Sequence, residues 1–218
     1  MEGLLPGVSG ISGKITVATP AHLKACLEIL LEGFGPQIEF LFSGQVPRLF
    51  LRDLLKLFHD VYPSGFLVAE DEMGNVSGFI LVRETELSWQ EKGLMFKHLS
   101  IILWRIFSGR YRDFSRCRLL GLFLRYTGYW WHCQKIVPAP AQIVLLTVAA
   151  SCRRQGLGQA LLRAGLDYLT RAGLPSVRLE VRADNQPAVH LYQKFGFEEK
   201  GCVRTAVGIS LVMVRSLP

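Results

Sequence analysis

Hydrophobic and polar positions follow two different periods along this chain, and each change of period marks a new element. Residues 14–18 (KITVA) form a short apolar run, which predicts a strand. Residues 19–34 place leucines at helical spacing behind a Thr-Pro pair, which favours a helix start. A second helix is predicted over 46–59. Two apolar runs within 65–84 flank a Met-Gly-Asn turn and predict a β-hairpin.

The second half of the chain shows the same regular periods. The run QIVLLTV at 142–148 predicts a strand, and 156–172 repeats apolar residues on one helical stripe. Residues 176–182 (SVRLEVR) alternate, which predicts a strand with one buried side. A short helix is predicted over 185–196, where a glycine ends it, and a final strand over 207–214.

Residues 84–135 interrupt these periods with two basic, aromatic-rich segments. We therefore expect a single domain over 1–218, with a helical insertion at about 84–135 between the third and fourth strands. The element order is β-α-α-β-β, insertion, β-α-β-α-β-β. This order predicts an α/β fold (an α+β mixed sheet), with helices on both faces of a central mixed β-sheet.

The composition narrows the class of protein without choosing a function. Of the 218 residues, 50% are hydrophobic and 20% are charged, which suits a packed domain and argues against disorder. The formal net charge is +7, so a polyanion, an anionic membrane or a negatively charged cofactor would each be attracted. The basic residues form no DNA- or RNA-binding motif, so no nucleic-acid partner is expected.

Cysteine usage and the N-terminal sequence bear on the compartment. The five cysteines are an odd number without a C-x-x-C pair, which suits a reduced cytoplasmic protein. No His, Cys and Asp residues have the spacing of metal ligands, so no metal is expected. The start MEGLLPGVSG does not resemble a signal peptide, and no run of about 18 to 20 apolar residues could span a membrane. We expect a cytoplasmic location.

The segment 151–162 (SCRRQGLGQALL) carries the first candidate site, at the start of a predicted helix. The first N–H groups of a helix have no intrahelical partner and favour negative charge. Gly156 and Gly158 leave the backbone open to phosphates, while Arg153 and Arg154 add charged donors. An anion site is one interpretation. A tight strand-to-helix turn with solvated arginines is the other.

A second motif lies one helix and one strand further on, within 179–197 (LEVRADNQPAVHLYQKFGF). The two motifs read R-x-x-G-x-G, from Arg153, and N-x-x-A-x-x-x-Y-x-x-x-G-F, from Asn185. Together they resemble the GNAT superfamily of N-acetyltransferases over residues 142–215. Within the superfamily, LEVRADNQPAVHLY is most similar to the enzymes that acetylate the N-terminal alanine of ribosomal proteins.

The resemblance implies acetyl-CoA, or a longer acyl-CoA, as the donor cosubstrate. The loop 153–159 would bind its pyrophosphate, and the end of the strand 142–148 would pair with its pantetheine arm through backbone groups. The residues implied in binding are Leu146, Thr147, Val148, Arg153, Arg154, Gln155, Gly156, Leu157, Gly158, Gln159 and Asn185.

The resemblance also implies two catalytic residues, Glu180 as base and Tyr192 as acid. Acyl transfer from a thioester to an amine removes a proton from the amine, polarises the carbonyl and protonates the departing thiolate. A phenol with a pKa of about 10 can protonate a thiolate whose acid has a pKa of about 8.5, and the N–H of Val148 can polarise the carbonyl. Structural interpretations stay open: Glu180 as an exposed carboxylate paired with Arg178 or Arg182, and Tyr192 as a packed aromatic.

The amine acceptor is less defined than the donor. The ribosomal-protein enzymes carry paired tyrosines before the last strand, where this chain has 201–208 (GCVRTAVG) with no aromatic residue. A short, non-aromatic loop there suits a small-molecule amine as well as a protein N-terminus. Two other functions stay open: a catalytically inactive acyl-CoA-binding module, and a membrane-peripheral acyltransferase that uses a longer acyl-CoA.

Residues 93–131 of the insertion place Leu, Ile, Phe and Trp beside Lys and Arg. Such a mixture predicts a helical hairpin that packs on the sheet or on a second copy of the chain in a homodimer. It is also the composition of a helix that rests peripherally on an anionic membrane, or of a lid over an apolar substrate.

Overall fold

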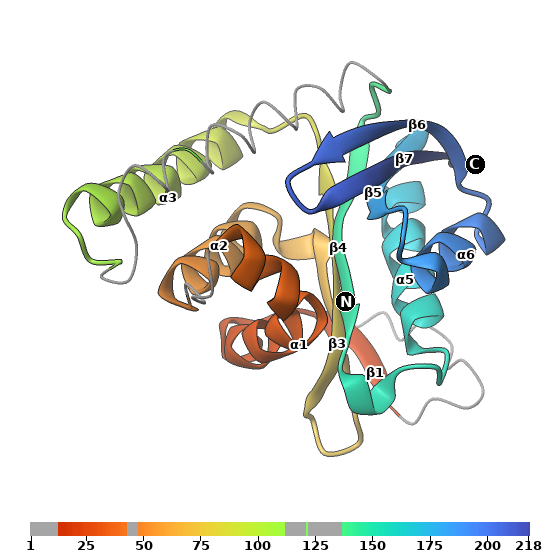
Figure 1. Ribbon diagram of the computed structural model, residues 1–218, viewed down its shortest axis with the longest axis horizontal. Coiled ribbons are helices and arrows are strands. Elements are labelled where there is room, and N and C mark those ends of the chain that lie inside the picture. Colours follow the sequence, from red (N-terminus) through yellow and green to blue (C-terminus); the bar gives the residue numbers. More distant parts are fainter. Residues whose placement is uncertain (1–12, 43–47, 112–120, 122–136) are drawn as a thin grey trace.

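The computed structural model describes residues 13–42, 48–111, 121 and 137–218 (Figure 1). Within them, seven strands form one sheet in the order β1-β2-β3-β4-β5-β7-β6. Neighbouring strands are antiparallel except β4 and β5, which are parallel. The strands are β1 (Lys14–Val17), β2 (Phe66–Glu70), β3 (Val76–Glu84), β4 (Ala141–Val148), β5 (Ser176–Arg182), β6 (Glu198–Thr205) and β7 (Gly208–Ser216).

The helices lie on both faces of the sheet. Figure 1 shows α5 and α6 on one face and α1, α2 and α3 on the other. The described α-helices are α1 (Leu23–Leu41), α2 (Arg48–Val61), α3 (Trp89–Phe107), α5 (Leu157–Arg171) and α6 (Gln186–Lys194).

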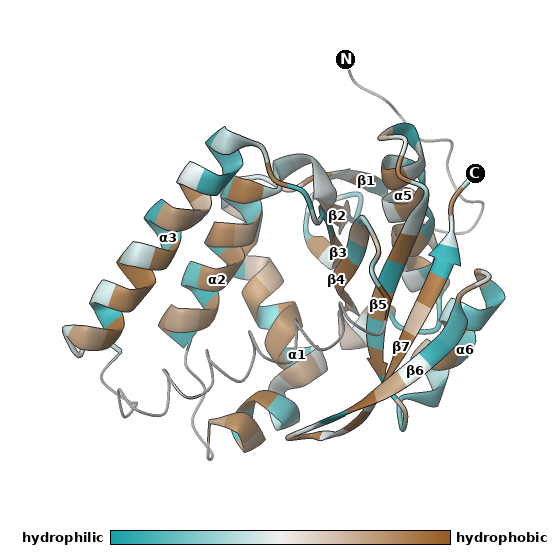
Figure 2. Ribbon diagram, turned by 90° about the horizontal axis from the view of Figure 1, so that it is seen from above, coloured by the Kyte–Doolittle hydropathy of each residue, from teal (hydrophilic) through white to brown (hydrophobic). Residues whose placement is uncertain are grey.

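Each face of the sheet has its own hydrophobic core. On one face, Leu161 and Leu162 of α5 are fully buried against the strands. On the other, α1 and α2 pack against Phe66 and Phe79. Burial on both faces explains the continuous apolar runs of β2 and β3. By contrast, β5 alternates between hydrophobic and hydrophilic residues (Figure 2).

The predicted element order and the fold class are confirmed. The first helix is longer than predicted, because α1 continues through Pro36 to Leu41. Pro36 has no N–H to donate to the carbonyl of Glu32. That carbonyl accepts instead from Arg153 Nη2 at 3.5 Å. A contact from a distant part of the chain thus replaces the missing helical bond.

The prediction of a loop at 201–208 is wrong. β6 continues to Thr205, and a turn at 206–207 joins it to β7. Val203 of β6 is buried beside Val212 of β7, which provides the apolar contact that holds the pair together. The segment before the last strand is therefore a regular hairpin.

The first half of the predicted insertion forms α3. Its start is a capping box, in which the Ser88 side chain accepts from the Glu91 N–H and the Glu91 carboxylate accepts from the Ser88 N–H at 2.7 Å. The second basic segment, at 116–132, lies outside the described residues except for residue 121. Among the described helices, none combines the length and hydrophobicity needed to cross a membrane.

Candidate active site

The candidate site is built on the strand β4, which pairs differently with its two neighbours. β4 pairs with β3 along its whole length, but its parallel pairing with β5 covers only residues 141–143. Val144 is an extra residue opposite β3, a β-bulge that bends the strand at this point. From 144 to 148, the side of β4 that faces β5 has no strand partner among the described residues. We call this side the β4 edge.

Two backbone units point outwards from the β4 edge. Ala149 donates its N–H to the carbonyl of Ser77 in β3 at 2.9 Å. Since successive residues of an antiparallel strand turn their backbone groups to opposite sides, those of Val148 and Leu146 point away from β3. Thr147, between them, is directed to β3 by its backbone. The N–H and C=O groups of Leu146 and Val148 are therefore presented towards β5.

The chain turns sharply between β4 and α5. A 3₁₀ turn (Ala150–Cys152) is followed by two residues with left-handed backbone, Arg154 (φ 61°) and Gly156 (φ 86°). Within the described residues, no acceptor binds the backbone N–H groups of 154–158, whereas those of the next two residues bond to the Gly156 carbonyl. Leu157 is buried and anchors the start of α5. Five N–H groups are thus available to an anion.

Gly158 lies in the first turn of α5, opposite the β4 edge. A Cβ atom at this position would lie 3.8 Å from Leu191 Cδ2 of α6 and 3.9 Å from Val148 Cγ2. These are ordinary van der Waals distances, so packing within the protein does not require a glycine here. The missing side chain leaves room beside the free N–H groups of the turn.

The two arginines of the turn have different surroundings. Arg153 Nε donates to the carbonyl of Val148 at 3.1 Å, and its Nη2 donates to that of Glu32. The Glu32 carboxylate also accepts from the N–H of Ala150 at 2.8 Å. Arg153 therefore fastens α1 to the end of β4, a contact that the sequence did not indicate. Arg154 is exposed. Both stay predicted ligands of a pyrophosphate.

The remaining predicted binding residues surround this turn. Gln155 Nε2 donates to the carbonyl of Ser151 at 3.0 Å, and Gln159 is exposed on the first turn of α5. Asn185 is the N-cap of α6, where its Oδ1 accepts from the N–H of Ala188 at 3.3 Å. This cap gives Asn185 a structural role, and its contact with a cosubstrate stays a prediction.

Tyr192 lies on α6, in the core on the α5 face of the sheet. Its side chain is 8% exposed, and its ring meets Phe197 edge-on with 5.7 Å between the ring centroids. Burial raises the pKa of the Tyr192 hydroxyl to about 12. The side chain is therefore a packed aromatic, and its hydroxyl keeps its proton at neutral pH.

Glu180 projects from the opposite face of the sheet. Its neighbours on β5, Leu179 and Val181, pack in the core beneath α5. Since side chains alternate along a strand, Glu180 and Arg178 are directed to the face that α1, α2 and α3 cover. Tyr192 and Glu180 therefore lie on opposite faces of the sheet.

Polar contacts hold the Glu180 carboxylate in place. Gln142 Nε2 donates to Oε2 at 2.6 Å, and Arg178 Nε lies 3.3 Å from Oε1. Gln142 in turn accepts from Arg83 Nε and Nη2, at 3.0 and 2.6 Å. Arg178 is fully buried and donates to the carbonyl of Val137 at 3.3 Å. The Gln142 and Arg83 contacts come from other strands and could not be predicted from the local sequence.

The structural interpretation of Glu180 is correct in part. Pairing with Arg178 is confirmed, but Arg182 binds Asp184 instead. The prediction of an exposed carboxylate is wrong, because the Glu180 side chain is only 13% exposed. The alternation of β5 predicted that one side of the strand is solvated. In the structure, α5 covers the side of Leu179 and Val181, and the contact with Gln142 of β4 shields Glu180 on the other side.

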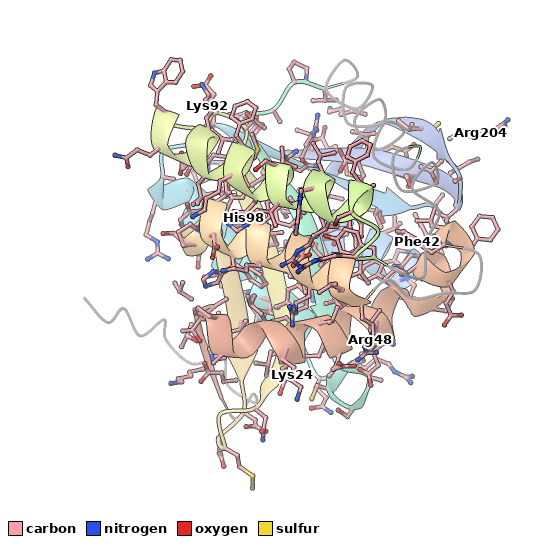
Figure 3. The ribbon with its side chains drawn as sticks, turned by 90° about the vertical axis from the view of Figure 1, so that its left-hand side faces the viewer. Lys24, Phe42, Arg48, Lys92, His98 and Arg204 are labelled. Atoms are coloured by element: carbon pink, nitrogen blue, oxygen red, sulfur yellow. The ribbon has the colours of Figure 1, made fainter. Side chains whose placement is uncertain are left out.

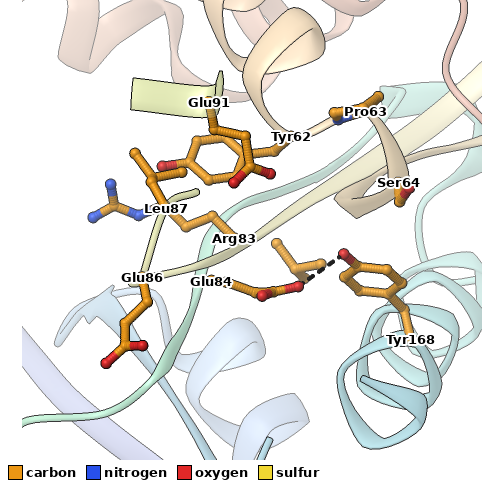
Figure 4. A pocket seen from close by; sticks show the side chains of 10 residues that line it. Tyr62, Pro63, Ser64, Arg83, Glu84, Glu86, Leu87, Glu91 and Tyr168 are labelled. Carbon is orange, nitrogen blue, oxygen red and sulfur yellow. Dashed lines mark hydrogen bonds between the residues drawn. The ribbon is translucent and has the colours of Figure 1, made fainter. Parts of the chain in front are cut away.

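A cavity of about 90 Å³ lies at the other end of β3, away from the β4 edge (Figure 4). Tyr168 donates its hydroxyl to Glu84 there at 3.2 Å. Burial, and then the Glu84 charge, raise the pKa of Tyr168 to about 12. Arg83 lines this cavity and also contacts Gln142, so the cavity wall and the Glu180 contacts share one residue. None of the predicted site residues lines the cavity.

A model of the acetyltransferase (GNAT) family matches residues 36–197. The chain belongs to this family. The match includes the β4 edge, the turn before α5, Glu180 and Tyr192. Within the described residues, no three His, Cys, Asp or Glu side chains are placed to hold a metal ion.

The curated relatives of this acetyltransferase-family chain match it over a short region. The mycothiol acetyltransferase of Renibacterium salmoninarum is 44% identical over 73 residues, which are 31% of this chain and 22% of that protein. That of Clavibacter michiganensis subsp. michiganensis is 41% identical over 75 residues, 34% of this chain and 24% of that protein. The chain thus spans about a quarter of the length of these relatives.

Solved structures share the fold over nearly the whole chain. Ard1 from Thermoplasma volcanium has a TM-score of 0.62 and 20% sequence identity, covering 95% of this chain and 99% of that one. The ribosomal-protein-S18-alanine N-acetyltransferase of Escherichia coli has a TM-score of 0.53 and 18% identity, covering 94% of each chain. At these sequence identities, the similarity shows a shared fold and nothing more.

Proposed function

We propose that the chain transfers an acetyl group from acetyl-CoA to a primary amine, by direct attack within a ternary complex. The single observation that carries the proposal is the unpaired β4 edge next to the free N–H groups at the start of α5. An extended, amide-containing arm can pair with the edge while its phosphates contact the helix start. The family of the chain favours such an enzyme over an inactive binding module.

The geometry suits acetyl-CoA at both ends of this path. The N–H groups of 154–158, with the left-handed turn at Gly156, offer several donors to a pyrophosphate. The N–H groups of Leu146 and Val148 and the carbonyl of Leu146 suit the amides of pantetheine, as in the addition of a strand to a sheet edge, whereas the Val148 carbonyl already accepts from Arg153. The N–H of Val148 is our candidate for the donor that polarises the thioester carbonyl.

The proposed reaction uses two side chains, one that accepts a proton and one that donates a proton. The amine nitrogen attacks the thioester carbon, and its proton passes to Glu180 directly or through a water. The carbon–sulfur bond breaks, and the departing sulfur takes a proton from Tyr192. The amide product and CoA leave, and each side chain then exchanges its proton with solvent.

The acceptor is proposed as a protein N-terminus or a small-molecule amine. An α-amino group has a pKa of about 8, so roughly a tenth of it is neutral at pH 7, while a lysine is neutral in less than about one molecule in a thousand. Glu180 is half-buried and held by two partners, which suits an acceptor that needs modest help with deprotonation. The hairpin of β6 and β7 adds no aromatic side chain at 201–208 that would grip a peptide.

The test of the function is CoA release from acetyl-CoA in the presence of pooled small amines and of pooled peptides with free N-termini. We expect acceptor-dependent release with at least one pool. A double variant, Glu180→Gln with Tyr192→Phe, serves as the control. Tight acetyl-CoA binding without release in either pool would favour a binding module instead.

Gln142→Glu tests whether Gln142 positions Glu180. The variant keeps the shape and the oxygen that Arg83 contacts, but it loses the N–H to Glu180 and places a like charge beside it. A like charge disfavours the ionised carboxylate, so we expect the acidic limb of the pH profile of kcat/KM to move up by about one unit. The isosteric control is Gln186→Glu, at an exposed position on α6. An unmoved limb would show that Gln142 does not act on the base.

A further inference from the structure

The helix α3 has two apolar faces, of which one is covered. The inner face packs on α2 and buries Ile102 and Ile106, each 4% exposed. Polar contacts reinforce this packing: His98 Nε2 lies 2.9 Å from Asp60 Oδ2, and Arg105 pairs with Asp53. In Figure 3, α3 is the outermost layer on this side of the molecule, and His98 lies between it and α2.

The outer face of α3 carries large aromatic side chains. Trp89 is 87% exposed, Phe96 67%, Trp104 54% and Phe107 59%. At 3.6 residues per turn, these four fall within an arc of roughly 80° on the helix. With Ile101, they are five of the ten exposed large hydrophobic side chains in the described part of the chain. Such a concentration on one helix indicates a surface that meets a partner.

The charges on this outer face have one sign. Lys92 and Lys97 are exposed, and the only carboxylate of α3, Glu91, is engaged in the helix cap. The Lys92 ammonium lies 5.0 Å from the centre of the Trp89 ring, and the Arg110 guanidinium lies 4.9 Å from that of Trp104. Cations thus lie directly over and beside the exposed aromatic rings.

We propose that the outer face of α3 docks the protein on an anionic membrane surface, with the helix lying in the plane of the interface. Tryptophan and phenylalanine beside lysine and arginine are the side chains that suit this depth of a bilayer. The net charge of +7 adds a favourable long-range attraction. The described part of α3 does not have the hydrophobicity of a spanning helix, which agrees with a peripheral position.

A second copy of the chain fits this face less well than a membrane. In a two-fold dimer, the same patch occurs on both partners, so each residue meets the surface of its own kind. Lys92, Lys97 and Arg110 of one copy would then face a surface of the same charge on the other, with no exposed carboxylate of α3 to compensate them. Anionic headgroups satisfy these cations, and the interfacial region accommodates the aromatic rings.

The experiment is sedimentation of the 218-residue chain with vesicles of phosphatidylcholine, alone or with about 30% phosphatidylserine. We expect binding to the anionic vesicles only, and weakening as the salt rises from about 50 to about 500 mM. Lys92→Glu with Lys97→Glu should weaken binding at least about 25-fold, since each basic residue near the surface contributes roughly fivefold. Phe96→Ser with Phe107→Ser should weaken binding at both salt concentrations.

Matched controls separate this face from the rest of the molecule. Lys24→Glu with Lys194→Glu makes the same change in net charge at exposed positions away from α3, and should weaken binding far less. Circular dichroism melts check that every variant is folded. The proposal is overturned if the wild-type chain ignores anionic vesicles at low salt, or if both lysine pairs weaken binding equally. It is also overturned if light scattering shows a dimer that the Phe96 and Phe107 changes dissociate.

Discussion

Replacement of Tyr192 by phenylalanine is expected to lower turnover by about a hundredfold, with little change in acetyl-CoA affinity. The substitution keeps the ring, its edge-on contact with Phe197 and the packing of α6, and removes only the hydroxyl. An acid that acts on the departing sulfur contributes in the transition state rather than in binding, so kcat and kcat/KM should fall together.

The environment of the phenol determines its protonation state. Burial raises the pKa of Tyr192 to about 12, so the proton is present throughout the neutral range. Transfer to a thiolate whose acid has a pKa of about 8.5 is uphill by roughly 5 kcal/mol. The phenol therefore starts as a hydrogen-bond donor to the sulfur and transfers its proton as the carbon–sulfur bond breaks.

Tyr168→Phe is the matched control for this prediction. Tyr168 also has a pKa raised to about 12, but its hydroxyl donates to Glu84 at the far end of β3. Its loss should change turnover less than about twofold. Steady-state release of CoA measures both variants. Full turnover in a folded Tyr192→Phe protein would show that the phenol is not the acid.

Gly158→Glu is expected to weaken acetyl-CoA binding by well over tenfold, or more than about 1.4 kcal/mol. A Cβ at Gly158 would stay at least 3.8 Å from its neighbours, so the fold does not require a glycine at this position. The added carboxylate would occupy the room beside the free N–H groups of 154–158 and repel the phosphates. A negative charge in the first turn of a helix also favours the helix, so stability should not fall.

Gly158→Ala separates charge from bulk at the same position. The methyl group fits, and its effect on affinity should be several-fold smaller than that of the glutamate. Isothermal titration measures affinity, and thermal melting without ligand measures stability. If Gly158→Glu is folded and binds acetyl-CoA as tightly as the wild type, the pyrophosphate does not lie at this turn.

Much of the fold could be predicted because its signals are local. The periods of 142–148, 156–172 and 176–182 gave β4, α5 and β5 nearly to the residue. The same was not true of α1, which was predicted to end at residue 34 and continues through Pro36 to Leu41. Its missing hydrogen bond matters little because the freed carbonyl of Glu32 finds Arg153, more than a hundred residues away. Such a compensation has no local signal.

Some features of the candidate site could also be predicted from the sequence, and others could not. The glycines and the helix start at 156–158 could be recognised from the chain, because an anion site of this kind is a local feature. The separation of β4 from β5 could not, since it depends on how far two strands pair in the sheet. The environment of Glu180 was also beyond prediction, because Gln142 and Arg83 come from neighbouring strands and cover a side that alternation alone assigns to solvent.

Hydrogen exchange at single amides, with and without acetyl-CoA, tests the central claim most directly. The claim is that the cosubstrate pairs with the β4 edge and that its phosphates contact the start of α5. Saturating acetyl-CoA should slow exchange at Leu146 and Val148 and across 154–158, while amides of β4 already bonded to β3 change little. Saturable binding that leaves these amides unprotected, or protects only a different part of the chain, would contradict the account.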